Sequence, residues 1–166
     1  MHRGIDMLAT EFAVRRARTD DALAAAKLLA AVAEEGGFSA TEGPVEVEQY
    51  AARFARNMDT SVVAYAGDKL VGGLYVDVSK HGFGTLGLLV DCDWRERGIG
   101  SALLTEAIDW ARSQGLHKLC AETFAHNENS IALYRKFGFV EEGRRARHYR
   151  RANGEFWDSV TMGLIL

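Results

Sequence analysis

The sequence is poor in residues that could crosslink a chain or hold it in a membrane. Its only two cysteines, Cys92 and Cys120, have neither the spacing of metal ligands nor that of a disulfide framework, and its five histidines are scattered. No apolar run approaches the roughly 18 to 20 residues of a membrane span, and residues 1–10 lack the basic-then-apolar order of a signal peptide. We therefore expect reduced cysteines with a packing role, no metal site, no membrane partner and a cytoplasmic location.

A surplus of positive charge is also absent. The formal net charge is -3 and is spread along the chain, so the sequence lacks the basic excess with which proteins neutralise nucleic-acid phosphates. With 48% hydrophobic and 26% charged residues, the composition is that of an ordinary globular protein.

Hydrophobic periodicity and turn residues predict one α/β domain. Short β-rich runs between turn residues predict strands, and apolar residues at helical spacing predict helices. The predicted strands are 11–18, 61–66, 70–77, 85–90, 118–124, 139–150 and 156–165, and the predicted helices are 19–36, 45–57, 98–114 and 130–137. We expect residues 1–10 to be frayed and residues 11–166 to form a single domain.

The order of these elements predicts a mixed, mostly antiparallel sheet. Gly67-Asp68-Lys69 joins two strands as a hairpin, and Asn153-Gly154 between the last two strands is a strong type I′ turn signal. The run Thr85 to Val90 is almost continuously apolar, as in a central strand buried on both faces. The helix 98–114 should connect it to the strand 118–124 by a right-handed crossover, which makes these two strands the central parallel pair.

The segment Arg95-Glu96-Arg97-Gly98-Ile99-Gly100-Ser101 lies between a buried strand and a long helix. The first turn of a helix has N–H groups without intrahelical partners, which suits a phosphate. Gly98 and Gly100 remove Cβ atoms that would obstruct such a ligand, and Arg95 and Arg97 add charge. The spacing alone is weak, since glycines can serve only a tight turn, but it fits a diphosphate loop better than a P-loop or a dinucleotide fingerprint.

Placed after a central strand, the pattern Arg-x-x-Gly-x-Gly resembles the first signature of the GCN5-related N-acetyltransferase (GNAT) family. The segment Asn127 to Phe139 resembles the second signature, Asn-x-x-Ala-x-x-Leu-Tyr-x-x-x-Gly-Phe, and departs from it at Ser130, where alanine is usual. The order of elements agrees over residues 11–166. The resemblance implies an acyl-CoA N-acyltransferase fold in which the parallel strands splay apart to hold acetyl-CoA, with no metal.

The same resemblance implies roles for residues beside the cofactor. Leu88, Leu89 and Val90 should hold the pantetheine arm through backbone groups, with the Val90 N–H polarising the thioester carbonyl. Tyr134 corresponds to the tyrosine that protonates the coenzyme A thiolate, and Asn127 should bind the pantetheine or cap the short helix. The implied cofactor-binding residues are Leu88, Leu89, Val90, Arg95, Arg97, Gly98, Ile99, Gly100, Ser101, Asn127, Ser130 and Tyr134.

The base for the acceptor amine is left open. An alkyl amine has a pKa of about 10 and must lose a proton before it attacks. Glu122 resembles the base of the branch that acetylates protein N-termini, and strand alternation can aim it at the acceptor cleft. The alternatives are ordered water, or a Glu122 that binds substrate or pairs with an arginine.

The acceptor pocket is expected at residues 34–42, by analogy with the family. Phe38 among acidic residues that include Glu42 suits a cationic amine, and a solvated loop is the alternative. Further cleft candidates are His148, Tyr149 and Asp158.

The basic run from Arg144 to Arg151 divides its side chains between the two faces of a strand. We expect a solvated edge with some role in the acceptor cleft or a homodimer, and no nucleic-acid partner. The predicted function is transfer of an acetyl group from acetyl-CoA to a primary amine of a small amine, an amino acid or a peptide N-terminus. The alternative is a non-catalytic acyl-CoA-binding sensor or scaffold.

Overall fold

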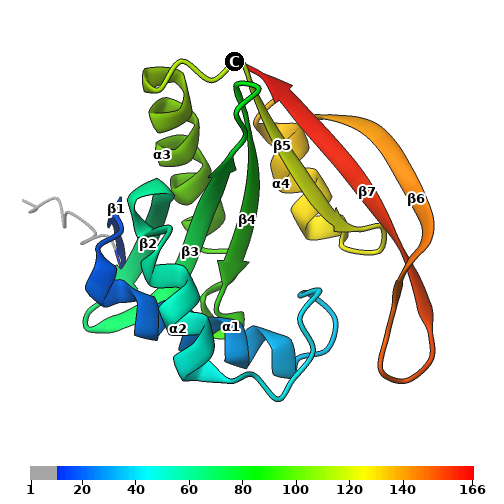
Figure 1. The fold of residues 1–166 in the computed structure, drawn as a ribbon, viewed down its shortest axis with the longest axis horizontal. Helices are drawn as coiled ribbons and strands as arrows, with labels where there is room; N and C mark the ends of the chain where they lie inside the picture. The colour runs from blue at the N-terminus through cyan, green and yellow to red at the C-terminus, as the bar shows by residue number, and fades with distance from the viewer. Residues whose placement is uncertain (1–10) are drawn as a thin grey trace, which may run out of the picture.

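The computed structural model describes residues 11–166, and the frayed start predicted for residues 1–10 lies outside them. The strands are β1 (Ala13–Arg16), β2 (Ser61–Ala66), β3 (Lys69–Val78), β4 (Phe83–Val90), β5 (Lys118–Phe124), β6 (Val140–Arg150) and β7 (Phe156–Ile165). They form one sheet in the order β1-β2-β3-β4-β5-β7-β6 (Figure 1). Only β4 and β5 among these neighbours are parallel, which confirms the predicted mixed sheet with a central parallel pair.

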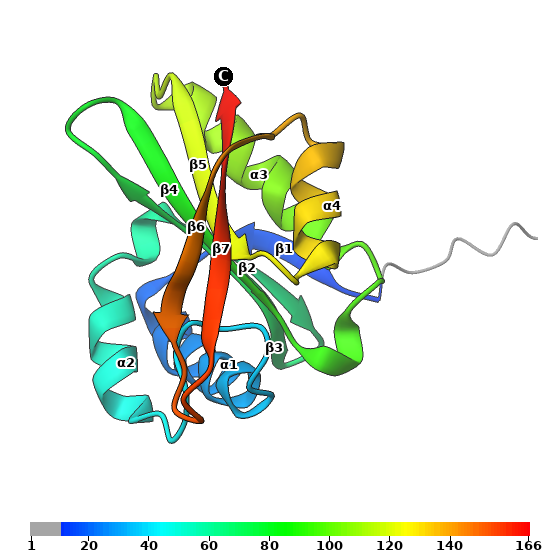
Figure 2. The same cartoon turned by 90° about the vertical axis from the view of Figure 1, so that its right-hand side faces the viewer.

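Helices cover both faces of this sheet (Figures 1 and 2). The α-helices are α1 (Ala22–Glu34), α2 (Val47–Ala55), α3 (Ile99–Ser113) and α4 (Glu128–Lys136). Short 3-10 turns are η1 (Thr19–Asp21), η2 (Met58–Thr60) and η3 (Cys92–Trp94). None of the helices within residues 11–166 is long and apolar enough to cross a membrane.

Alternation along β2 places the two main helices on opposite faces. Val62 belongs to the large core that includes Leu103 and Leu104 of α3, whereas Val63 packs with Leu28 of α1. Successive residues of a strand point to opposite faces, so α1 and α3 enclose the sheet between them. Leu103 and Leu104 are fully buried, and burial of such a side chain contributes about 1.5–3 kcal/mol.

The predicted last hairpin forms, but its turn is not type I′. That turn needs a positive φ at both central residues, and here Gly154 has a φ of 89° while Asn153 has no positive φ. Gly154 N–H donates to Arg151 O at 2.9 Å, and Arg151 N–H donates to Glu155 O at 2.8 Å. The Asn-Gly pair therefore ends a three-residue loop, in which a left-handed glycine follows an ordinary turn.

The two cysteines lie in different environments. Both are free, but Cys120 is half-buried on β5 whereas Cys92 is exposed after β4. The predicted packing role therefore fits Cys120 and is wrong for Cys92.

One buried carboxylate ties the N-terminal segment to β2. Asp21, which is 3% exposed, accepts hydrogen bonds from the Arg15 guanidinium at 2.7 and 2.9 Å. It also accepts from the Tyr65 hydroxyl at 2.8 Å and from Arg18 N–H at 2.7 Å. These bonds, above all that with Arg15, lower the pKa of Asp21 from 3.8 to about 2.

Asp21→Asn is expected to lower the free energy of unfolding at pH 7 by about 2 kcal/mol, because it leaves the Arg15 charge unpaired. Since the pKa of Asp21 is lower in the folded state, its contribution is complete above about pH 4 and is lost as the pH falls toward about 2. Urea denaturation at neutral and acidic pH measures both effects, with exposed Asp20→Asn as the control. If the variant's loss of unfolding free energy were as large at acidic pH as at pH 7, this account would be wrong.

Candidate active site

The two parallel strands separate part of the way along their length. β4 and β5 pair only as far as Leu86 and Ala121. Beyond that point β4 continues beside β3 to Val90, and β5 continues beside β7 to Phe124 (Figure 1). A cleft of about 470 Å³ lies where they diverge. The second half of β4 is therefore partly exposed, and the prediction of burial on both faces is wrong there.

Backbone groups of β4 point into this opening. Asp91 N–H donates to Val71 O at 2.9 Å, and hydrogen-bonded pairs alternate along an antiparallel ladder. Leu89, two residues earlier, therefore bonds toward β3 as well. Leu88 and Val90 direct their N–H groups to the other side, where β5 has already turned away. Both N–H groups thus point away from β3, but only Leu88 lines the cleft; Val90, the predicted donor to the thioester, is not part of its wall.

Many of the predicted residues line the cleft, and so do others that sequence reasoning missed. The predicted residues in its wall are Phe38, Leu88, Leu89, Glu122, Asn127, Ser130, Tyr134 and Tyr149. The residues not predicted include Tyr50, Arg53, Phe54, Tyr75, Asp77 and Phe124. The helical spacing of Tyr50 and Phe54 indicated an apolar face of α2, but not that this face meets the cleft.

Tyr75 lies directly opposite Gly87 in the β3–β4 pair. A Cβ atom on Gly87 would come within 2.3 Å of the Tyr75 ring, so only glycine lets this ring lie across β4. The pair gives the cleft an aromatic wall beside the diverging strands. In the sequence, a tyrosine placed opposite a glycine in a predicted hairpin could have indicated that the ring lies across the neighbouring strand.

Glu122 is held in the cleft wall by several donors. Its carboxylate accepts from Ser159 Oγ at 2.6 Å, from the Arg145 guanidinium at 3.0 Å and from the Tyr149 hydroxyl at 3.4 Å. His148 Nε2 lies 4.0 Å away. Burial, followed by the charge of Glu122, raises the pKa of Tyr149. Glu122 thus pairs with an arginine, Arg145, which was one of the predicted alternatives. It also lines the cleft, and its role as base stays a prediction.

A bulge in β6 brings these donors to Glu122. Between Arg145 and Tyr149, three residues of β6 stand opposite the single residue Asp158 of β7. The Asp158 carboxylate accepts from Arg147 N–H at 2.7 Å and from Arg144 Nε at 2.9 Å, and these bonds lower the pKa of Asp158. Asp158 therefore holds the bulge. It does not line the cleft, so its predicted place there is wrong.

Tyr134 and Asn127 face the cleft from α4. Asn127 is the N-cap of this helix, with Oδ1 accepting from Ser130 N–H at 3.2 Å, which confirms the predicted cap. Tyr134 is 4% exposed, and burial raises its pKa. The hydroxyl is protonated at neutral pH, as in any tyrosine, and can donate a hydrogen bond into the cleft, while its raised pKa makes it a weaker acid.

The segment Arg95 to Ser101, here called the glycine loop, lies between the end of β4 and the first turn of α3. Gly98 is the N-cap residue with a φ of 85°, and no atom lies within 4 Å of where its Cβ would be. The first intrahelical bond joins Ala102 N–H to Gly98 O at 3.0 Å, so the N–H groups between them are free for an anion. A Cβ on Gly100 would come within 2.8 Å of Leu133, so this glycine serves helix packing. The Ile99 side chain is buried in the core.

The arginines of the loop are engaged by acidic partners. The Arg95 guanidinium donates to both Glu35 oxygens, at 2.6 and 2.7 Å, and lies 4.5 Å from the centre of the Phe38 ring. Arg97 donates to Glu11 at 2.9 Å. A diphosphate would have to displace these carboxylates to bind the side chains, so the predicted arginine contacts stay predictions.

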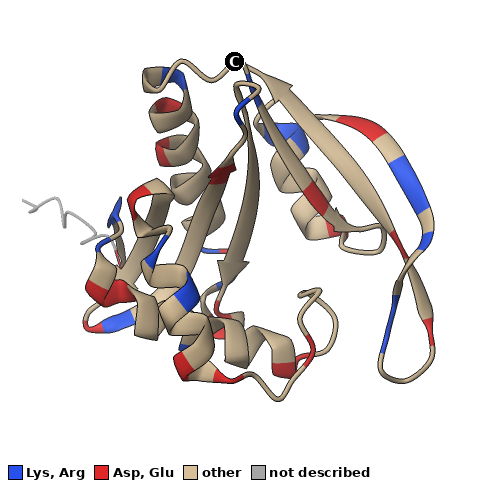
Figure 3. Ribbon diagram, in the orientation of Figure 1, with Lys and Arg blue, Asp and Glu red and all other residues tan. Residues whose placement is uncertain are grey.

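The remaining candidates depart from expectation. The Glu42 carboxylate does not line the cleft, because it accepts from Ala152 N–H at 3.0 Å and lies 3.3 Å from Arg151 Nε. Most of β6 is exposed, as predicted for the basic run, and Figure 3 shows its mixed charges along the edge strand. Arg151 is the exception, since it is only 4% exposed.

One cluster within residues 11–166 has the geometry of metal ligands, Asp91, Cys92 and Asp93. Asp91 is paired with Lys69 at 2.8 Å and accepts from Asp93 N–H at 3.0 Å. Because its carboxylate is already satisfied, we assign no metal to this cluster.

Comparison with known proteins identifies the family to which this chain is similar. The model described as "Acetyltransferase (GNAT) family" matches residues 25–139. The L-amino acid N-acetyltransferase AaaT of Escherichia coli strain K12 is 31% identical over 112 residues, which cover 63% of this chain and 67% of the relative. The [Ribosomal protein bS18]-alanine N-acetyltransferase of Salmonella typhimurium is 38% identical over 77 residues, 46% of this chain. The chain spans about half, 51%, of that relative.

Solved structures share the fold over nearly the whole chain. A GNAT superfamily phosphinothricin acetyltransferase from Sinorhizobium meliloti, in complex with acetyl-CoA, superposes with a TM-score of 0.83. The match covers 94% of this chain and 89% of the other at 22% identity, so it establishes the fold.

Proposed function

The chain belongs to the acetyltransferase (GNAT) family, and we propose that residues 11–166 act as one domain that moves an acetyl group from acetyl-CoA to a primary amine. The chain is an acetyl-CoA-dependent N-acetyltransferase, and the amine attacks the thioester directly in a ternary complex. The main support is the cleft between β4 and β5, which Leu88 of β4 and Tyr134 of α4 both line.

The residues present fit acetyl-CoA as co-substrate. The pantetheine arm takes hydrogen bonds from the N–H groups of Leu88 and Val90, which have no partner on β5. The diphosphate lies at the start of α3, where Gly98 leaves space and the first N–H groups are free. The two sites follow one another along the end of β4 into α3.

Gly98→Ala is expected to weaken acetyl-CoA binding about tenfold, because a left-handed alanine costs about 1–2 kcal/mol and the loop must move to relieve it. Calorimetric titration measures the affinity. Gly67→Ala is the matched control, since Gly67 also has a positive φ and open space but lies in the β2–β3 turn. An equal loss in both variants, or none in Gly98→Ala, would contradict a phosphate site here.

A cationic amine loses two protons in the reaction, one before it attacks and one once the C–N bond has formed, and one proton must reach the sulfur. The amine nitrogen attacks the thioester carbonyl carbon, and the Val90 N–H donates to the oxygen that becomes negative. Glu122 accepts the first proton, directly or through ordered water, before the C–N bond forms, and the second leaves the tetrahedral intermediate through water. The C–S bond then breaks with its electron pair on sulfur, and the Tyr134 hydroxyl protonates the thiolate.

The acceptor is a small amine, an amino acid or a peptide N-terminus. The names of both relatives specify an amino-acid acceptor, one as an L-amino acid and the other as an alanine of a ribosomal protein. In this chain Glu122 and the aromatic side chains of Phe38, Tyr75 and Tyr149 suit a cationic amine before it loses its proton.

An acceptor screen with detection of free coenzyme A thiol tests the activity and the acceptor together. The panel contains free L-amino acids, an alanine-initiated hexapeptide and simple alkylamines, each with acetyl-CoA. Release of thiol with formation of the acetylated amine supports the enzyme. Tight binding of acetyl-CoA without product across the panel would favour the sensor or scaffold alternative.

A further inference from the structure

Residues 35–42, here called the bridging loop, cross the open end of the cleft. At one end Glu35 and Phe38 are held by Arg95, which follows β4. Further along, the Gly37 carbonyl lies 3.3 Å from Nε2 of His126, which follows β5. The bridging loop is therefore anchored to the ends of both diverging strands.

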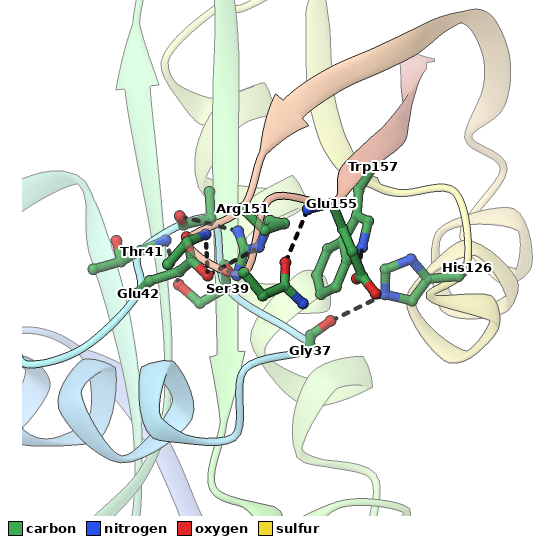
Figure 4. Close-up of polar contacts among 11 residues, drawn as sticks. Gly37, Ser39, Thr41, Glu42, His126, Arg151, Glu155 and Trp157 are labelled. Atoms are coloured by element: carbon green, nitrogen blue, oxygen red, sulfur yellow. Dashed lines mark hydrogen bonds and ion pairs between the residues drawn. The ribbon is translucent and has the colours of Figure 1, made fainter.

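A third anchor is the guanidinium of Arg151, which directly follows β6. It lies against two neighbouring aromatic rings, 5.1 Å from the centre of Phe124 and 4.4 Å from that of Trp157. From there it donates to Ser39 O at 3.1 Å and to Ala40 O at 3.3 Å (Figure 4). A planar fork can reach two successive carbonyls, which the single ammonium of a lysine cannot do in the same geometry.

The negative charge of Glu42, a residue of the bridging loop, is paired with the positive charge of Arg151. Its carboxylate lies 3.3 Å from Arg151 Nε and also accepts from Ala152 N–H at 3.0 Å. Arg151 is 4% exposed whereas the Glu42 side chain is 33% exposed, so the pair joins a buried guanidinium to a carboxylate that still meets water. A pair of this kind contributes less to net stability than to fixing one arrangement of the groups it joins.

The bridging loop forms part of the cleft wall. Phe38, Ser39, Ala40 and Thr41 all line the cleft, and Ser39 and Ala40 are the residues whose carbonyls Arg151 holds. The contacts of Arg151 lie on the hairpin side, whereas the glycine loop and the N-terminus of α3 follow β4. Ser39 and Ala40 are thus positioned from the β6–β7 hairpin, whereas Glu35 and Phe38 are held by Arg95 on the cofactor side.

We propose that Arg151 is a positioning residue for the acceptor, holding the bridging loop against the β6–β7 hairpin so that the loop walls the acceptor end of the cleft. This rests on the proposed acetyl transfer. A loop released from Arg151 leaves the acceptor amine poorly oriented toward the thioester, while the cofactor groups keep their places.

The test compares Arg151→Lys and Arg151→Gln with Arg150→Gln, an exposed neighbour that loses the same charge. We expect both Arg151 variants to raise the acceptor KM about tenfold, with the KM for acetyl-CoA within about twofold of the parent. The acceptors are L-alanine and the alanine-initiated hexapeptide. An unchanged acceptor KM, or equal rises in both KM values, would overturn the proposal, since the second result indicates a merely structural role.

A second measurement does not depend on turnover. Amide hydrogen exchange of residues 37–42 should be faster in Arg151→Lys than in the parent or in Arg150→Gln, and unchanged exchange would refute the anchor. If the Arg151 variants do not fold, Glu42→Gln weakens the anchor from the loop side and should raise the acceptor KM and the exchange in the same direction. A parent protein without turnover would refute the proposed function, whereas the exchange result would still decide the anchor.

Discussion

Tyr134→Phe is expected to lower kcat about a hundredfold and to leave the affinity for acetyl-CoA within about twofold. Tyr134 lines the cleft, where its hydroxyl can donate to the leaving thiolate, even though burial raises its pKa and so makes it a weaker acid. The ring, which packs 5.3 Å from Phe139, is retained in phenylalanine, so the packing of α4 should survive.

Steady-state kinetics and calorimetric titration separate the two effects of this substitution. Tyr65→Phe is the matched control, because it removes a hydroxyl from the Asp21 network and should leave kcat unchanged. An unaltered kcat in Tyr134→Phe would remove this hydroxyl from the mechanism. A large loss of acetyl-CoA affinity would instead assign it to binding.

Glu122→Gln is expected to lower kcat/KM at pH 7 by roughly ten- to a hundredfold and to shift the pH optimum upward. An amide cannot take the proton of the amine, so the variant depends on acceptor that is already neutral, whose fraction grows toward the amine pKa of about 10. The hydrogen bond from Ser159 to this position can form with either side chain, so the local structure should persist.

The complete pH profile of kcat/KM is the decisive measurement for Glu122. Glu106→Gln, an exposed change on α3, is the control for loss of one negative charge and should leave the profile in place. A profile of Glu122→Gln that coincides with the parent would leave ordered water as the only route for the proton.

The parts of the fold that could be predicted are those determined by short segments. The strands Ser61–Ala66, Lys118–Phe124 and Phe156–Ile165 begin and end where alternation and turn residues place them. The hairpin at Asn153-Gly154 was placed correctly but given the wrong turn. Asn-Gly suits both the central pair of a type I′ turn and the end of a three-residue loop.

The parts that could not be predicted depend on contacts between distant residues. Glu42 and Ala152 are 110 positions apart, and no local pattern indicates that one binds the other. Residues 34–42 did reach the predicted cleft, but through Phe38 and its neighbours, because Glu42 is turned toward the hairpin. Arg151 was included in a solvated basic run, since its burial depends on the rings of Phe124 and Trp157, which come from two other parts of the sheet.

Because the β4–β5 ladder stops at Leu86 and Ala121, the remaining parts of both strands have unpaired edges in the middle of the sheet. An exposed row of backbone donors and acceptors is usually a liability, because any extended chain can pair with it. In the proposed complex the edge at Leu88 and Val90 faces acetyl-CoA, and the peptide-like amides of pantetheine offer the pairing that a neighbouring strand would give. In the proposed complex acetyl-CoA therefore pairs with β4 as a neighbouring strand would, and its binding and release complete and reopen the ladder.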